Sequence, residues 1–238
     1  MPEPAPGAGP AVPSAPGRRP IVLDDVKRDS EVEAYLTKAN EYTGAIGYTE
    51  HGFRHATLVS NIAGNILRRL DDDERLVQLA AIAGYLHDIG NLVGRVGHEA
   101  TGALLASRIL TRLGMDPLDM AVVMGAIGNH EELTGEPVSD VCAALIIADK
   151  SDVHRTRVRN PDPTTFDIHD RVNYAVEHSF LRVDAPARSV TLELTIDTRI
   201  SQVMEYFEIF LPRMAMCRRA AQWLHCQFRL QMNGTKLL

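Results

Sequence analysis

Residues 72–90 read DDERLVQLAAIAGYLHDIG. The acidic start of this stretch suits the N-terminus of a helix, where the helix dipole favours negative charge. Apolar residues then follow at helical spacing, and Gly90 ends the pattern. These residues are Leu76, Leu79, Ala80, Ala83 and Leu86. We therefore predict a largely buried helix that ends in His87-Asp88, where a buried imidazole and carboxylate are costly unless they are paired or bind a metal.

Helical patterns continue on both sides of this stretch. Residues 29–70 predict two helices separated by a glycine-containing break near Gly44–Gly47. Residues 99–113 predict another helix, ended by Gly114. Asp116-Pro117 provides the cap and first turn of the next helix, and Ser139 caps a further one. The sequence thus predicts a helical bundle through about Val153.

The C-terminal part changes character. Pro161-Asp162-Pro163 marks a loop, and residues 168–178 predict one more helix. From Ser189 the run SVTLELTID alternates apolar and polar residues, which is typical of a strand with one buried face. A second strand is predicted at Gln227–Met232. Residues 201–224 between them are rich in helix formers, and Pro212 is expected to kink or split that helix.

These patterns define the predicted organisation. The fold class is mainly α, a helical bundle with a small C-terminal β-α-β appendage. We expect a disordered Pro/Ala-rich tail at 1–20, a helical domain at 21–180 and the C-terminal appendage at 181–238. A two-stranded unit is marginal alone, so we expect the C-terminal appendage to form a homodimer contact or to cover a pocket.

Composition narrows the function classes. The formal charge of −6 gives no general attraction to nucleic acid or to anionic lipid, so a phosphate-bearing substrate must be held by local positive charge or metal. The tail lacks a signal-peptide core, and no apolar run is long enough to span a bilayer, so we expect a cytoplasmic protein without a membrane partner. Cys142, Cys217 and Cys226 lack CxxC spacing and are interpreted as reduced core residues.

Two further side chains join the His87-Asp88 pair. His55 lies in HATLVSNIA and Asp149 lies in ALIIADKSD, and both stretches are otherwise apolar helical patterns. Four candidate ligands on three helices can therefore converge. A shell of imidazole and carboxylate groups suits manganese, iron, cobalt, nickel or zinc better than calcium.

The order His55, His87-Asp88, Asp149 resembles the HD superfamily of metal-dependent phosphohydrolases, over most of residues 48–155. The resemblance implies an HD-type helical metal-binding domain in which these four side chains hold a divalent metal that activates water. We favour His55 over His51 as the ligand, because His55 precedes the apolar run, and we place His51 in the pocket lining.

His98 and His130 lie between the HD pair and Asp149 in the sequence. In the binuclear branch of the superfamily, two histidines at these points hold a second metal, and the aspartate of the HD pair bridges both. The resemblance thus implies that Asp88, His98 and His130 form a second site, with metals roughly 3.5–4 Å apart. A mononuclear member would keep one of these histidines as a substrate contact, so one or two metals are expected.

Charged residues near the last ligand are candidates for substrate contact. Lys150 and Arg155 lie within two turns of Asp149 and are predicted, with Asp88, to be the catalytic residues, the two cations by steadying phosphate charge. Arg157 and Arg159 are interpreted as a solvated basic edge. Asp152 is placed either behind a ligand or at the surface.

Other residues near the His87-Asp88 motif support weaker inferences about function. Glu131 and Glu132 either orient a ligand or relay a proton, or are simply solvated. Asn91 stands where many members of the family have a lysine, and no glycine-tyrosine-proline extension of cyclic-di-nucleotide phosphodiesterases follows His98. The role of that lysine and that specific activity are therefore not predicted.

The predicted function is a metal-dependent phosphohydrolase that cleaves a small phosphate ester or a nucleotide. Two alternatives stay open. Some helical HD enzymes use the same ligand set to hold a mixed-valence di-iron centre and act as oxygenases. A non-catalytic sensor would bind a nucleotide in the same pocket and signal through the C-terminal appendage.

Overall fold

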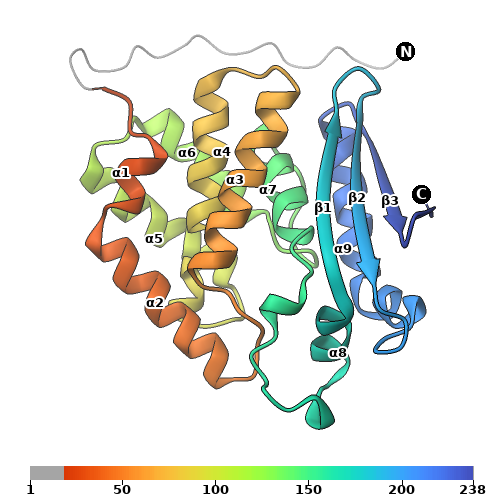
Figure 1. The fold of residues 1–238 in the computed structure, drawn as a ribbon. Helices are drawn as coiled ribbons and strands as arrows, with labels where there is room; N and C mark the ends of the chain where they lie inside the picture. Colours follow the sequence, from red (N-terminus) through yellow and green to blue (C-terminus); the bar gives the residue numbers. More distant parts are fainter. Residues whose placement is uncertain (1–18, 238) are drawn as a thin grey trace.

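The computed structural model describes residues 19–237, so most of the predicted disordered tail lies outside the described residues. The predicted helices of the bundle are all present (Figure 1). Asp116 and Ser139 cap α6 and α7 as predicted, each through a side-chain oxygen that accepts a backbone N–H. The elements are α1 (Leu23–Lys27), α2 (Ser30–Ala45), α3 (Phe53–Arg69), α4 (Glu74–Leu86), the 3-10 turn η1 (Ile89–Leu92), α5 (His98–Leu113), α6 (Pro117–Gly128) and α7 (Asp140–Lys150).

Helices α3, α4 and α7 form the centre of the bundle and contact one another. Every residue of α7 from Val141 to Lys150 is buried, and α4 is buried from Leu79 to Leu86. The close packing of α3 on α4 depends on Gly84, because a Cβ there would lie 2.8 Å from the Cα of Ser60. The apolar surfaces of these helices therefore bring the N-terminus of α3 close to the C-terminal ends of α4 and α7.

The C-terminal part forms a four-stranded sheet backed by α9 (Figure 1). Strand order is β1-β2-β3-β4, with β2 parallel to β3 and the other neighbours antiparallel. The predicted β-α-β unit is thus β2-α9-β3, extended by a strand at each edge. The elements are η2 (Arg155–Arg157), η3 (Pro163–Thr165), α8 (Ile168–Ala175), β1 (Val176–Asp184), β2 (Ser189–Ile196), α9 (Val203–Trp223), β3 (Gln227–Met232) and β4 (Thr235–Lys236).

One prediction in this region is wrong, and another is narrowed. Helix α8 ends at Ala175, and His178 lies in β1, which continues through the predicted boundary at residue 181. Residues 176–184 form a strand because they pair with β2 in an antiparallel hairpin, a contact that the local helical pattern does not reveal. Helix α9 runs through Pro212 as one helix, with the buried residues Phe210 and Met214 on either side of the proline, so of the expected kink or split the split is not found.

The helix α9 joins the sheet to the bundle. It packs on β2 and β3 on one side and on α7 on the other. Cys142, Cys217 and Cys226 are buried and free, as predicted. No helix among residues 19–237 is both long enough and apolar enough to cross a membrane.

The turn η1 packs against the first two turns of α5 through Gly90. A Cβ at Gly90 would lie 1.9 Å from the carbonyl oxygen of His98 and 2.5 Å from the amide nitrogen of Gly102. Both contacts are with backbone, which cannot swing away as a side chain can. The absence of a side chain at Gly90 therefore lets the chain after His87-Asp88 lie directly on α5.

We predict that Gly90→Ala destabilises the protein by about 1–3 kcal/mol or more, because the new methyl group forces η1 away from α5. At roughly 2–4 °C per kcal/mol for a chain of this size, Tm should fall by several degrees in a thermal melt. Gly94→Ala is the matched control, because a Cβ at Gly94 meets nothing within 4 Å. Equal melting temperatures for the two variants would contradict the close contact.

Candidate metal centre

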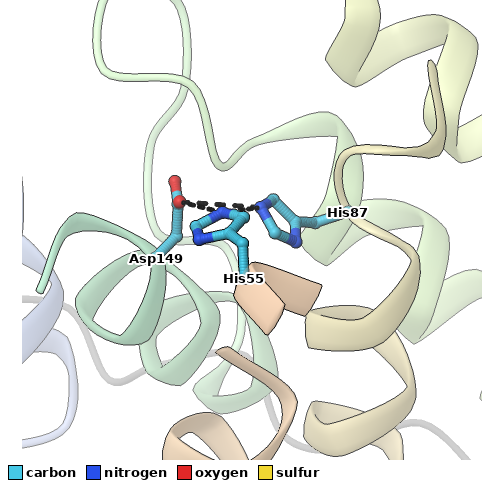
Figure 2. A group of neighbouring side chains, drawn as sticks. All are labelled: His55, His87 and Asp149. Carbon is cyan, nitrogen blue, oxygen red and sulfur yellow. Dashed lines mark hydrogen bonds and ion pairs between the residues drawn. The ribbon is translucent and has the colours of Figure 1, made fainter. Parts of the chain in front are cut away.

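Six of the predicted residues meet at the ends of the bundle elements. His55 lies in the first turn of α3, His87 follows the last residue of α4, and Asp149 lies in the last turn of α7 (Figure 2). Asp88 precedes η1, His98 begins α5 and His130 follows α6. All six are buried, with exposed fractions of 9% or less. We refer to these six residues as the His/Asp cluster.

The first half of the His/Asp cluster consists of three residues, His55, His87 and Asp149. The Nε2 atoms of His55 and His87 lie 3.1 Å apart. Asp149 Oδ1 lies 3.2 Å from the first of these nitrogens and 3.5 Å from the second (Figure 2). Three ligand atoms therefore converge within the reach of one metal ion.

The second half lies on the other side of Asp88. Its Oδ2 is 3.4 Å from His55 Nε2 and 3.3 Å from His87 Nε2, whereas its Oδ1 is 3.4 Å from His98 Nε2. His98 Nε2 in turn lies 3.2 Å from His130 Nε2. Asp88 thus turns one carboxylate oxygen toward each histidine pair, which is the placement that a bridging ligand requires.

The hydrogen bonds of the four histidines show that these side chains fit a metal. Each Nδ1 lies within hydrogen-bond distance of an acceptor: Asp152 Oδ2 for His55, and the carbonyl oxygens of Gly84, Arg95 and Ile127 for His87, His98 and His130. With Nδ1 carrying the proton, each Nε2 presents a lone pair. Two facing lone pairs repel unless a cation lies between them, and this arrangement occurs in both pairs.

Asp88 gives independent support for a cation. Its Oδ2 is buried and accepts no hydrogen bond from any described residue. A buried carboxylate oxygen without a partner is costly, and a metal ion removes that cost. The His/Asp cluster therefore suits one or two divalent metals, and its mixed nitrogen and oxygen ligands do not decide which metal.

The pKa values of His87 and His130 also indicate that one side of the cluster favours a positive charge. Burial by itself would lower the pKa of His87, but the adjacent Asp88 and Asp149 carboxylates raise it to about 10. The pKa of His130 instead falls to about 3, because burial and the charges of His87 and Lys150 both disfavour its protonation. The two carboxylates thus attract positive charge to the His55–His87 side, and a divalent metal supplies it.

Comparison with known proteins agrees with this geometry. The family model of the HD domain matches residues 52–154. The chain contains an HD domain. All six residues of the His/Asp cluster lie within it.

The chain is also similar to a protein of known structure. That protein is a predicted HD superfamily hydrolase from an uncultured Thermotogales bacterium, with 28% identity and a TM-score of 0.43, over 56% of this chain and 75% of the other. The chain is further similar to the uncharacterized protein MJ1020 of Methanocaldococcus jannaschii, with 25% identity over 210 residues, which are 78% of this chain and 80% of that protein.

Within the HD domain, Asp152 supports His55. Its Oδ2 lies 2.6 Å from His55 Nδ1, and Arg54 binds the carboxylate with two hydrogen bonds of 3.2 and 2.7 Å. Asp152 therefore lies behind a ligand, one of the two places considered from the sequence. The Nδ1 atoms of His87 and His130 face backbone carbonyls, whereas that of His98 lies 3.0 Å from the Arg95 carbonyl oxygen and 3.3 Å from Glu99 Oε2.

Of the two cations predicted to steady phosphate charge, Lys150 lies beside Asp149, whereas Arg155 lies away from the His/Asp cluster. Lys150 is buried, and its Nζ lies 2.7 Å from Asp149 Oδ2 and 2.6 Å from Glu132 Oε2. Arg155 is not part of the His/Asp cluster: it pairs with Glu177 at 3.1 Å and lies over the ring of Tyr174. The chain turns at η2, which begins five residues after the end of α7, and Arg155 therefore lies on the partly exposed side of this turn.

Arg157 corrects a second prediction. It is buried rather than part of a solvated edge, and its guanidinium donates to the carbonyl oxygens of Glu50 and Asp152 and lies 3.1 Å from His51 Nε2. Arg159 is exposed, as predicted, and bonds to Asn40. Because of this turn at η2, Arg155 and Arg159 lie toward solvent, whereas Arg157 lies in the interior.

A cavity of about 640 Å³ opens beside the His/Asp cluster. His51 lines it, as predicted, together with His98 and Glu131. Two arginines that were not predicted, Arg95, three residues before His98, and Arg213 of α9, line both this cavity and a small chamber against Asp88, His130 and Asp149. Arg95 is close to the motif and could have been found by that proximity, whereas no sequence pattern marks Arg213.

We predict that His130→Ala lowers the metal content of the purified protein from two ions per chain toward one. The substitution removes an Nε2 from the second half of the cluster and leaves the His55–His87–Asp149 trio intact. Metal content is measured by mass spectrometry after gel filtration, with His178→Ala, an exposed histidine of β1, as the control. Unchanged stoichiometry would exclude His130 as a ligand.

We also predict that Asp152→Asn weakens metal binding by about 10–100-fold, because His55 loses the carboxylate that orients it and increases its basicity. The measurement is a competition titration with a chromophoric chelator. Glu177→Gln, which removes an exposed carboxylate next to Arg155, should leave the affinity unchanged. If both variants bind metal equally well, Asp152 does not act through His55.

Proposed function

We propose that this chain is a metal-dependent phosphohydrolase that cleaves a small phosphate ester or a nucleotide. The observation that carries the proposal is the position of Asp88 between two histidine pairs, against a small chamber that shares Arg95, His98 and Arg213 with the larger cavity. An arrangement with two adjacent cation sites suits phosphoryl transfer, because both the attacking and the leaving oxygen need stabilisation.

Divalent metals bound in the cluster would polarise the phosphoryl group and make water a better nucleophile near neutral pH. The protein's own residues fix the geometry for this chemistry. Lys150 holds Asp149 Oδ2, so that Oδ1 faces His55 and His87. We therefore assign Lys150 to orienting a ligand, since its Nζ is engaged by two carboxylates.

Glu131 is the candidate proton donor. It lines both the small chamber and the cavity, and its Oε2 lies 3.8 Å from His98 Nε2 and 3.4 Å from Arg95 Nη2. Burial and the adjacent Glu132 charge raise the pKa of Glu131, whereas the charges of Lys150 and Arg95 oppose this shift, and a metal held by the adjacent His98 and His130 would oppose it further. A protonated carboxyl at this position can pass its proton to the leaving oxygen.

The cavity fits a small phosphate-bearing substrate. Its volume is within the range of ordinary ligand sites. Although the chain is acidic as a whole, three arginines line this cavity: Arg95, Arg157 and Arg213. Five carboxylates line the same cavity, so the arginines act as individual phosphate contacts, and a metal in the His/Asp cluster would supply the further positive charge that a phosphate needs.

The test is phosphate release from a panel of nucleotides and small phosphate esters, with manganese, iron, cobalt or nickel supplied. We predict turnover by the native protein and its loss, by at least about 10³-fold, in Asp88→Ala, which removes a ligand from both halves of the cluster. His178→Ala should retain full turnover.

Two other results would replace the proposal. Oxygen consumption with a mixed-valence di-iron signal, and no phosphate release, would indicate the oxygenase. Nucleotide binding without turnover under any metal would indicate the sensor.

A further inference from the structure

The cationic side chains around the His/Asp cluster differ in whether their N–H groups are free. Lys150 is held between two carboxylates, and Arg157 uses all three of its guanidinium nitrogens on Glu50, Asp152 and His51. Arg95 divides its donors among Asn91, His98 and Glu131. Lys150 and Arg157 thus offer no free pair of N–H donors, and Arg95 keeps its contacts with Asn91 and Glu131 even when His98 Nε2 is reserved for a metal.

Arg213 is different. Its Nε donates to Glu132 Oε1 at 3.2 Å, and its guanidinium carbon lies 4.7 Å from the centre of the Phe210 ring. Its Nη1 and Nη2 donate no hydrogen bond to any residue in the part of the chain that the structure describes. The side chain is 24% exposed, so the guanidinium is fixed on one edge and accessible on the other.

Arg213 lies at the wall of two cavities beside the His/Asp cluster. It lines the small chamber against Asp88, His130 and Asp149, and it lines the larger cavity that opens from there. A group that reached from the chamber into the cavity would therefore lie beside Arg213. The free donors of Arg213 therefore lie where the phosphate oxygens of such a substrate would be.

We propose that Arg213 binds the phosphate of the substrate, so that the C-terminal appendage completes the site of the HD domain. This inference rests on the proposed function. A planar guanidinium presents two parallel N–H donors that match two phosphate oxygens, and the contacts with Glu132 and Phe210 reduce the entropy lost on binding.

The docking of α9 on the bundle supports this role. Arg213 lies in a row of three contacts along α9: Arg213 with Glu132, Arg219 with Glu136 at 3.1 Å, and Trp223 Nε1 with Asp140 Oδ1 at 2.9 Å. These contacts reach from the segment after His130 to the N-terminus of α7. The helix that carries Arg213 is thus held at a fixed position relative to the metal ligands.

The experiment is a calorimetric titration of inorganic phosphate into the manganese-loaded full chain. Arg213→Gln should weaken phosphate binding at least about tenfold, because a charge-assisted hydrogen bond is lost. Metal content should stay at the native level. Arg213→Lys, which keeps the charge but not the fork, should fall between the two, and Arg218→Gln, an exposed arginine of the same helix, should bind like the native protein.

A purely structural role is tested by the double variant Arg213→Gln/Glu132→Gln. If Arg213 only neutralises Glu132, the double variant regains native phosphate affinity, and the inference fails. Equal affinity of Arg213→Gln and the native protein also overturns it, and leaves the proposed function standing. A native protein that binds manganese but no phosphate would instead contradict the inference and the proposed function together.

Discussion

The rest of the site depends on the burial of the Asp88 carboxylate between two pairs of histidine Nε2 atoms. One oxygen faces His55 and His87 and the other faces His98. Such a carboxylate is tolerated in the interior when positive charge surrounds it, and the pKa of Asp88 is well below its usual range because the histidine charges outweigh the effect of burial. The elements that carry these residues must therefore meet within a few ångströms.

The fold achieves this by placing polar residues at the ends of helices whose middles are apolar. Helices α4 and α7 are buried along most of their length, and each presents a ligand at its C-terminal end. The contact of Gly90 with the backbone of α5 then brings the second histidine pair to the same carboxylate. Hydrophobic packing thus positions groups that would not associate by themselves.

Around the cluster, each buried charge has a partner of opposite sign. Asp152 is paired with Arg54 on the α3 side, and Glu132 is paired with both Lys150 and Arg213 on the α9 side. Removing one member of such a pair leaves a buried charge uncompensated, which is strongly unfavourable. Because Arg213 belongs to α9, the electrostatic environment of the HD domain extends beyond residues 52–154.

The sequence by itself determined the bundle helices and four of the six cluster residues, His55, His87, Asp88 and Asp149, because helical periodicity is local and a polar residue within an apolar pattern is visible without coordinates. The resemblance to the HD superfamily added His98 and His130. The sequence did not determine the strand β1, which depends on pairing with β2, nor the sides on which Arg155 and Arg157 emerge. Arg213 was invisible for a related reason: it lies far along the chain from His130 and Asp149. The docking of α9 on α7 decides that it reaches the cavity, since contacts between distant segments arise from packing and not from local pattern.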